Sequence, residues 1–244
     1  MPDARGAVRM QAVARPGGGV RWLARLDPVD RARYRSLVAP LAPVVERSLG
    51  VEVLANRAVG RGRWPTVRLE AWRRARATWA RRVEAALASD LTRAALITDV
   101  AACYASIEPE VVARRLRASG APGPRVESLE RFLHDLGERG VPGLPVGPSP
   151  SALLANLVLA APDEHVRAAG LRHIRWVDDV IVFAPGRRAA LRGYDAFRRA
   201  LDELGLHPNP RKTVLLDDPA EVRGRVRGHG WSASRGFACD DAAP

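Results

Sequence analysis

The residue types best suited to chemistry in this chain stand together between positions 173 and 184. The stretch reads His-Ile-Arg-Trp-Val-Asp-Asp-Val-Ile-Val-Phe-Ala, with the adjacent carboxylates of Asp178 and Asp179 between two apolar, β-branched runs. Such runs form strands, so the pattern predicts a β-hairpin with the aspartates at or near its turn. Neighbouring carboxylates on a sheet repel each other and are costly to desolvate. Either this turn is exposed to water, or bound divalent cations offset both the repulsion and the desolvation cost.

A third carboxylate follows another predicted strand. Residues 94–100 are mostly apolar and predict a buried strand that ends at Asp99. Three carboxylates from neighbouring strands can hold two Mg²⁺ about 4 Å apart, an arrangement that stabilises the attacking and leaving oxygens of a phosphoryl transfer. Mg²⁺ favours a few carboxylates together with substrate phosphates. We therefore expect two Mg²⁺ ions, for which Mn²⁺ can substitute.

The elements that must position these carboxylates follow from the apolar pattern. It predicts helices at about 28–49, 67–88, 109–118 and 191–204, a helix that Ser149 caps, and a last strand at about 211–216. Pro40 and Pro43 are expected to kink or split the first helix. Helices interleaved with a mostly antiparallel sheet indicate an α+β fold.

Positive charge is concentrated in the first part of the chain. The 244 residues carry a net charge of +12; residues 1–92 hold 18 arginines and 8 acids, whereas residues 93–244 are nearly balanced. Lys212 is the only lysine, which indicates that genomic base composition has favoured arginine. Base composition explains why arginine replaces lysine, but it does not explain why basic residues outnumber acidic ones. A basic lobe of this kind predicts a polyanionic partner such as nucleic acid or nucleotide phosphates.

Other classes of protein are disfavoured by composition. No apolar run approaches the 18 or so residues of a membrane span, and the N-terminus lacks the apolar core of a signal peptide. Cys103 and Cys239 are far apart and lack metal-ligand spacing, so we read them as free thiols. We expect a cytoplasmic protein with no membrane partner.

Four motifs, in order along the chain, resemble those of the reverse transcriptases. Residues 97–107 resemble the first catalytic motif, in which an aspartate precedes an aromatic residue by five positions. Residues 143–150 with Asn156 resemble the second, residues 176–179 the catalytic Asp-Asp motif, and residues 205–213 the motif after it. The resemblance covers about residues 50–216 and is firmest over 94–216.

The resemblance implies roles for the residues that match the family's catalytic positions. Asp99, Asp178 and Asp179 would hold the metal ions with the backbone carbonyl of Val100. Lys212 would approach the leaving pyrophosphate and donate a proton, which arginine cannot readily do.

Other matching positions would bind the nucleotide. Tyr104 would exclude a ribose 2′-hydroxyl and so favour dNTPs; a core tyrosine is the alternative. Gly147 would line the nucleotide pocket. Arg57, Arg61 and Arg63 fall where the family's fingers bind the triphosphate.

The resemblance also implies a right-hand polymerase core of fingers and palm, with an antiparallel palm sheet packed on helices. Residues 1–92 would form a mainly helical fingers lobe, with poor order over 1–20. Residues 93–217 would form the palm, and residues 218–244 a polar tail. The tail is too short for the family's thumb, so we expect that domain to be absent and a partner protein, RNA or self-assembly to replace it.

Two departures from the family pattern narrow the comparison. Trp176 stands where tyrosine is usual, and Val146 replaces the glutamine common in retroviral enzymes. The latter motif looks closest to bacterial abortive-infection and unknown-group reverse transcriptases, which act in antiphage defence.

The sequence therefore favours an RNA-directed DNA polymerase that copies an RNA template from a DNA or RNA primer with dNTPs. One alternative keeps the chemistry as an RNA polymerase or a template-independent nucleotidyltransferase. Another is a non-catalytic nucleic-acid-binding subunit built on the same palm.

Overall fold

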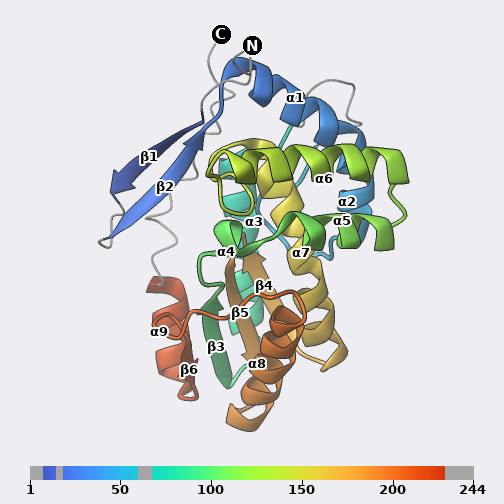
Figure 1. Cartoon of the computed structure of the whole chain (residues 1–244). Coiled ribbons are helices and arrows are strands. Elements are labelled where there is room, and N and C mark those ends of the chain that lie inside the picture. The colour runs from blue at the N-terminus through green and yellow to red at the C-terminus, as the bar shows by residue number, and fades with distance from the viewer. Residues whose placement is uncertain (1–7, 15–18, 60–67, 229–244) are drawn as a thin grey trace, which may run out of the picture.

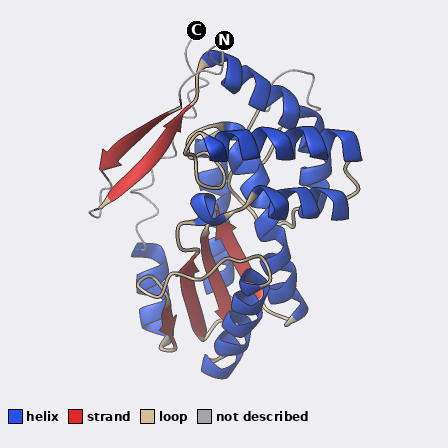
Figure 2. Cartoon of the chain, in the orientation of Figure 1, coloured by secondary structure: helices blue, strands red, loops and turns tan. Residues whose placement is uncertain are grey.

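The structure is a computed structural model that describes residues 8–14, 19–59 and 68–228. Two antiparallel sheets stand among helices (Figures 1 and 2). The smaller sheet is the hairpin of β1 (Arg9–Ala14) and β2 (Val20–Arg25). The larger has the order β4-β5-β3-β6, made of β3 (Ala94–Asp99), β4 (Arg172–Trp176), β5 (Asp179–Ala184) and β6 (Val214–Leu216).

The helices fall into an N-terminal group and a palm group. The first group comprises α1 (Pro28–Val38), the 3₁₀ turn η1 (Ala39–Leu41), α2 (Ala42–Ser48) and α3 (Trp72–Leu87). The second comprises α4 (Cys103–Ser106), α5 (Pro109–Ala118), α6 (Gly123–Glu138), α7 (Ser149–Ala168), α8 (Arg187–Asp202) and α9 (Pro219–Gly228). None of the helices in the described part of the chain combines the length and the apolar character that a membrane crossing requires.

The four-stranded sheet is covered by helices on both faces, because its strands are apolar on both sides. Alternate residues of a strand point to opposite faces. On β3, Leu96 joins the main core, which α7 and α8 complete, whereas Ile97 joins a second cluster with residues of α3 and α9. The predicted α+β architecture, an antiparallel palm sheet packed on helices, is confirmed.

Several predicted elements have close counterparts. The first helix is split at its prolines into α1, η1 and α2, as expected. The side chain of Asp27 caps α1 by accepting hydrogen bonds from the amides of Val29 and Asp30 at 2.8 and 2.9 Å. The helix predicted from about residue 67 begins at Trp72 instead, and Ser149 is the first residue of α7 rather than its cap.

Three parts of the chain differ from the sequence predictions. Residues 9–14, expected to be poorly ordered, form β1 because they pair in full register with β2. Helix α6 was not predicted, although Val126, Leu129 and Leu133 recur at helical spacing and are buried. Residues 219–228, assigned to a polar tail, form α9 because Val222 and Val226, one turn apart, are buried against the second cluster.

Candidate active site

The predicted Asp-Asp hairpin is present and ends beside Asp99. Strands β4 and β5 are joined by a two-residue turn of Val177 and Asp178, with Trp176 paired to Asp179. In the neighbouring pair of strands, Asp179 lies opposite Asp99. The amide of Val100 donates a hydrogen bond to the carbonyl of Asp178 at 3.2 Å. The structure therefore brings the three predicted carboxylate residues together at one end of the sheet.

The turn that carries Asp178 is strained. Val177 has a φ of +58°, in the left-handed region that β-branched residues rarely adopt. Such a conformation costs roughly 1–2 kcal/mol for an L-residue. A strained backbone persists only where surrounding contacts hold it, and such sites are concentrated at functional positions.

The three carboxylates destabilise one another when they are charged. Burial raises the pKa of Asp178, and the charge of Asp99 raises it further. Burial and then the charge of Asp178 raise the pKa of Asp179 to about 7. Like charges in a partly buried site disfavour ionisation in this way.

The donor set fits divalent cations. Asp99 is 3% exposed, and its Oδ1 atom has no hydrogen-bond partner among the described residues. A buried carboxylate oxygen without a donor, beside two carboxylates that resist ionisation, gains most from a bound cation. Asp99, Asp178, Asp179 and the carbonyl of Val100 are the groups that would hold it.

Lys212 lies at the same end of the sheet. Its ammonium group donates a hydrogen bond to Oδ2 of Asp99. The amide of Asn209 bonds the carbonyl of Asp99 at 2.8 Å and so fastens the loop that presents Lys212. Burial lowers the pKa of Lys212, but the hydrogen bond to Asp99 and the carboxylate charges outweigh it, so that the pKa stands above its ordinary value.

The loop that contains the predicted pocket residue Gly147 contacts the backbone of Tyr104 through Gly143 and Leu144. Gly143 has a φ of +56°, and a Cβ there would come within 2.5 Å of the carbonyl oxygen of Tyr104. The same oxygen accepts a hydrogen bond from the amide of Leu144 at 2.8 Å. Gly147, at φ +126°, continues this loop. A side chain at position 143 would clash with the backbone of Tyr104 on α4, so glycine allows this close approach of the loop.

Of the three arginines predicted to bind the triphosphate, the structure describes Arg57. Arg57 bonds Glu46 at 2.8 Å and the carbonyls of Gly50 and Val53 at 2.9 and 3.2 Å. Arg61 and Arg63 lie outside the described residues. The structure thus describes an ion pair for Arg57 within the N-terminal lobe.

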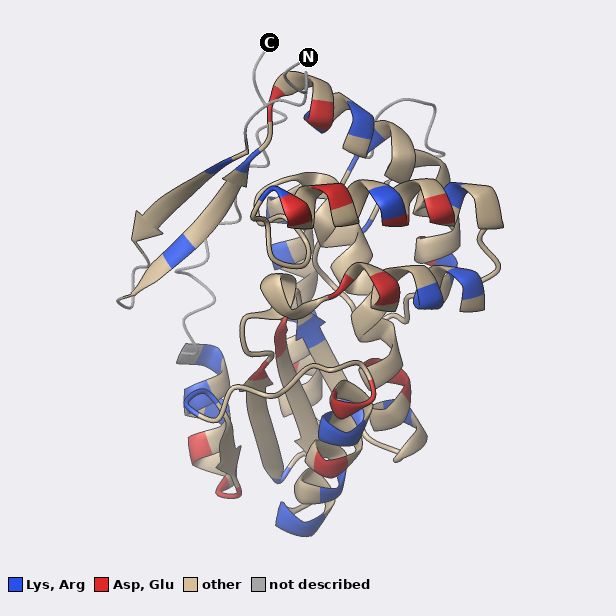
Figure 3. Cartoon of the chain, in the orientation of Figure 1, with Lys and Arg blue, Asp and Glu red and all other residues tan. Residues whose placement is uncertain are grey.

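Arg21 is a basic residue near the site that the sequence did not single out. Its charge lowers the pKa of both Asp178 and Asp179. It lies on β2, which the amide of Ala24 joins to the carbonyl of Val146 at 3.0 Å. Figure 3 shows basic residues on both strands of this hairpin. Arginine is abundant in this part of the chain, and no local pattern marks Arg21 as one that lies near the aspartates.

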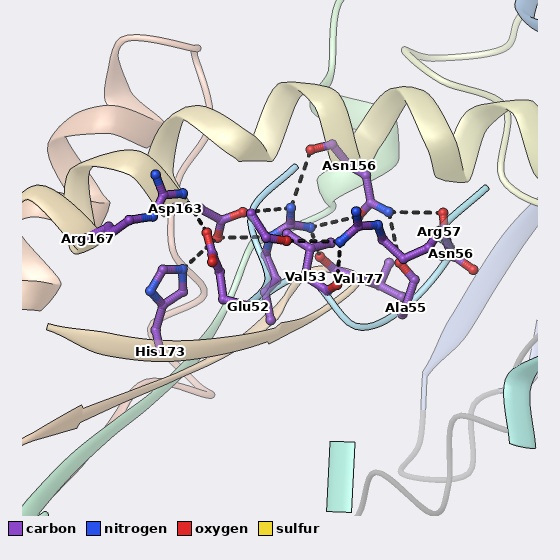
Figure 4. A network of polar contacts seen from close by, with 12 residues as sticks. Glu52, Val53, Ala55, Asn56, Arg57, Asn156, Asp163, Arg167, His173 and Val177 are labelled. Atoms are coloured by element: carbon purple, nitrogen blue, oxygen red, sulfur yellow. Dashed lines mark hydrogen bonds and ion pairs between the residues drawn. The ribbon is translucent and has the colours of Figure 1, made fainter. Parts of the chain in front are cut away.

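A second group of titratable residues lies along the edge of the sheet that β4 forms (Figure 4). Glu52, Asp163 and His173 are buried, and one ligand atom from each lies within 4.8 Å of the others. Arg167 bonds Glu52 at 2.6 Å, and Arg175 bonds Asp163 at 2.8 Å. Two guanidinium groups already balance the two carboxylates, so we interpret this group as a buried ion network rather than a metal site.

An antiparallel palm sheet that carries carboxylates at one end of two neighbouring strands defines the class of palm-domain nucleotide polymerases. Residues 66–225 match the family model described as "Reverse transcriptase (RNA-dependent DNA polymerase)". That match covers more than half of the chain, which therefore belongs to the reverse transcriptase family.

Two solved telomerases share the fold. One is telomerase from Candida albicans in complex with a TWJ fragment of telomeric RNA, with a TM-score of 0.57 and 12% identity over 88% of this chain and 43% of that chain. The other is apo telomerase from Candida tropicalis truncated from its C-terminal domain, with a TM-score of 0.57 and 10% identity over 87% of this chain and 50% of that one. The chain thus spans about half the length of these structures. A search of curated proteins gave no match.

Proposed function

We propose that this chain is an RNA-directed DNA polymerase that adds dNTPs to a primer 3′-hydroxyl by a two-metal mechanism. The observation that carries the proposal is the meeting of Asp99, Asp178 and Asp179 at one end of the palm sheet, with a buried oxygen of Asp99 that has no partner among the described residues. Family membership supports nucleotidyl transfer as the reaction class.

The residues of the site have separable tasks in this proposal. Bound Mg²⁺ ions would polarise the phosphate oxygens and favour ionisation of the primer hydroxyl. The three aspartates supply the negative charge that holds cations against the sheet. Lys212 is protonated at neutral pH and half-exposed at the rim of the site. As the bond between the α-phosphorus and pyrophosphate breaks, this ammonium group can donate a proton to the leaving oxygen.

The pocket loop and Tyr104 would select the nucleotide. A tyrosine ring beside the sugar leaves no room for a 2′-hydroxyl, so the site would accept dNTPs and reject rNTPs. The basic residues of the N-terminal part would attract the triphosphate and the template phosphates. The Candida albicans telomerase, which shares this fold, is in complex with a fragment of telomeric RNA, and this supports an RNA template as the partner.

The test is primer extension on an RNA template. Purified protein, primed RNA, Mg²⁺ and labelled dNTPs should give incorporation that Asp178→Asn abolishes. Asp195→Asn, a change at an exposed aspartate of α8, is the matched control and should leave incorporation unchanged. Equal incorporation by wild type and Asp178→Asn would contradict the proposal.

Parallel reactions separate this activity from its alternatives. Incorporation of rNTPs, or incorporation without a template, would favour an RNA polymerase or a terminal transferase. Salt-dependent RNA binding without turnover would favour a binding subunit. Three expectations stay predictions from the sequence: a role in antiphage defence, a partner that binds the product duplex, and a cytoplasmic location.

A further inference from the structure

Arg175 is a fully buried arginine whose three guanidinium nitrogens all donate hydrogen bonds. Its exposed fraction is 0%. Nε donates to both carboxylate oxygens of Asp163 at 3.0 and 2.9 Å, and Nη2 donates to the carbonyl of Asn156 at 3.3 Å. Nη2 also forms an ion pair with Oδ2 of Asp163 at 2.8 Å. Nη1 donates to Oδ1 of Asn156 and to the carbonyl of Val177, each at 2.8 Å. Each of the three guanidinium nitrogens therefore donates at least one hydrogen bond.

The bond to Val177 reaches the strained turn itself. The carbonyl of Val177 belongs to the peptide that joins Val177 to Asp178, so a donor fixed on this oxygen fixes the plane of that peptide. Rotation of the peptide would change the direction in which the Asp178 side chain leaves the backbone. Because Val177 is strained at φ +58°, the turn needs such a contact to keep one conformation.

The other contacts of Arg175 make it a rigid anchor. Asp163 and Asn156 both project from α7 toward the strand (Figure 4). The backbone of Arg175 also pairs with the segment beside it in space, since its amide donates to the carbonyl of Glu52 at 2.9 Å and its carbonyl accepts from Leu54 at 3.1 Å. Residues 52–54 thus hold the backbone of Arg175, and α7 holds its guanidinium.

The same network extends to residues 55 and 56 of the N-terminal lobe. The side-chain Nδ2 of Asn156 donates hydrogen bonds to the backbone carbonyls of Ala55 and Asn56 at 2.9 and 3.2 Å. Asn156 therefore contacts the guanidinium with its oxygen and the N-terminal lobe with its nitrogen. A shift of residues 55–56 would be transmitted to the Val177 carbonyl through the side chains of Asn156 and Arg175.

We propose that Arg175, held by Asp163 and Asn156, is a positioning residue that sets the conformation of the Val177–Asp178 turn and thereby the metal affinity of the site. This inference rests on the proposed function of the aspartates but concerns residues that touch neither metal nor substrate. A partner in the outer shell of a metal site typically changes metal affinity or activity by about 10–100-fold when it is removed. We expect an effect of that size here.

The test compares three changes with a matched control. Arg175→Met with Asp163→Leu removes both members of the buried ion pair, so that no unpaired buried charge is left. Arg175→Lys keeps the charge but has three donors in place of five and no planar fork. Asn156→Ala removes a bond that orients the guanidinium. The control is Arg139→Met with Asp30→Leu. It removes a partly buried ion pair, 2.6 Å apart, between Arg139 at the C-terminal cap of α6 and Asp30 on α1.

Two measurements are made on each protein. Binding of Mn²⁺ alone is followed by electron paramagnetic resonance, and the Mg²⁺ concentration for half-maximal primer extension is found by titration. We expect each of the three changes to weaken Mn²⁺ binding at least 10-fold and to raise the Mg²⁺ requirement to match, with the KM for dNTP within about threefold of wild type. The control should change neither quantity.

The outcomes separate this inference from the proposed function. Folded Arg175→Lys or Asn156→Ala protein with Mn²⁺ affinity within twofold of wild type would overturn the positioning role, whatever its polymerase activity. Equal losses in the control and the test variants would also overturn it, because they would show a general packing effect. Wild type that binds Mn²⁺ without any incorporation would refute the polymerase proposal and leave the positioning role to be judged by the Mn²⁺ data.

Discussion

Replacement of Asp179 by asparagine should stabilise the metal-free protein while it abolishes the proposed activity. The side chain keeps its shape in this change and loses only its charge. Burial and the neighbouring Asp178 raise the pKa of Asp179 from 3.8 to about 7 in the folded state. Between about pH 4 and pH 7 the folded protein therefore binds a proton that the unfolded chain releases, and stability falls as the pH rises through this window.

The magnitude follows from the displaced pKa. At about 1.4 kcal/mol for each tenfold change in proton affinity, the ionised side chain would cost the folded protein at most about 4 kcal/mol above pH 7. Asp179 is partly exposed and titrates together with Asp178, and solvent screening reduces the cost to about 2 kcal/mol. In a chain of this length that corresponds to a rise of about 4–8 °C in Tm for Asp179→Asn at pH 8.

The assay is thermal unfolding in EDTA, followed by circular dichroism at pH 4 and at pH 8. Wild type and Asp179→Asn should unfold at similar temperatures at pH 4, where the carboxyl is protonated in the folded state, and separate at pH 8. Asp195→Asn is the control for a general effect of lost charge. The reasoning fails if the Tm of Asp179→Asn at pH 8 exceeds that of wild type by less than 1 °C, or if the same gap is present at pH 4.

Four further outcomes are expected. Addition of Mg²⁺ at pH 8 should raise the Tm of wild type more than that of Asp179→Asn, because the cation relieves the repulsion between carboxylates; equal shifts in differential scanning calorimetry would speak against a metal at this site. Lys212→Ala should lower kcat about 100-fold in single-turnover primer extension, with Lys212→Arg recovering little because it keeps the charge but cannot readily give up a proton; full recovery would show that charge alone matters. Tyr104→Val should raise rNTP incorporation relative to dNTP by at least 10-fold in a competition assay, and an unchanged ratio would remove the steric role. Gly143→Ala should lower the Tm by several degrees, because its Cβ would lie 2.5 Å from the Tyr104 carbonyl in a backbone conformation that alanine avoids; a Tm within 1 °C of wild type would mean that the loop can move.

The position of the candidate carboxylates at one end of the sheet could be predicted because their signal is local. Two adjacent acids between β-branched runs predict a hairpin, and an acid at the end of an apolar strand predicts a partner at the same edge of the sheet. Lys212 was found through a motif that follows the hairpin. The antiparallel sheet then brought Asp99 opposite Asp179 by its register alone.

Other parts of the site depend on contacts distant in sequence, which no local pattern encodes. Arg21 was missed because arginine is abundant in the first 92 residues and nothing local marks one as facing the aspartates. Helix α9 was missed because its apolar residues, Val222 and Val226, are few and make sense only against α3 and the sheet. The apolar residues of α6 recur at helical spacing, so the sequence does contain the signal for this helix.

Arg175 shows most clearly why the site needs more than its carboxylates. In the sequence it is one polar residue within an apolar strand, and the usual expectation for such a residue is that it faces water. The structure buries it completely, because Asp163, Asn156 and the Val177 carbonyl together satisfy a charge that would otherwise be excluded from the core. The repulsion among three aspartates and the strain at Val177 both oppose the conformation that the proposed metal binding would require. A buried arginine at the base of the turn, bonded to Asp163, Asn156 and the Val177 carbonyl, is the contact that can hold this conformation before any cation arrives.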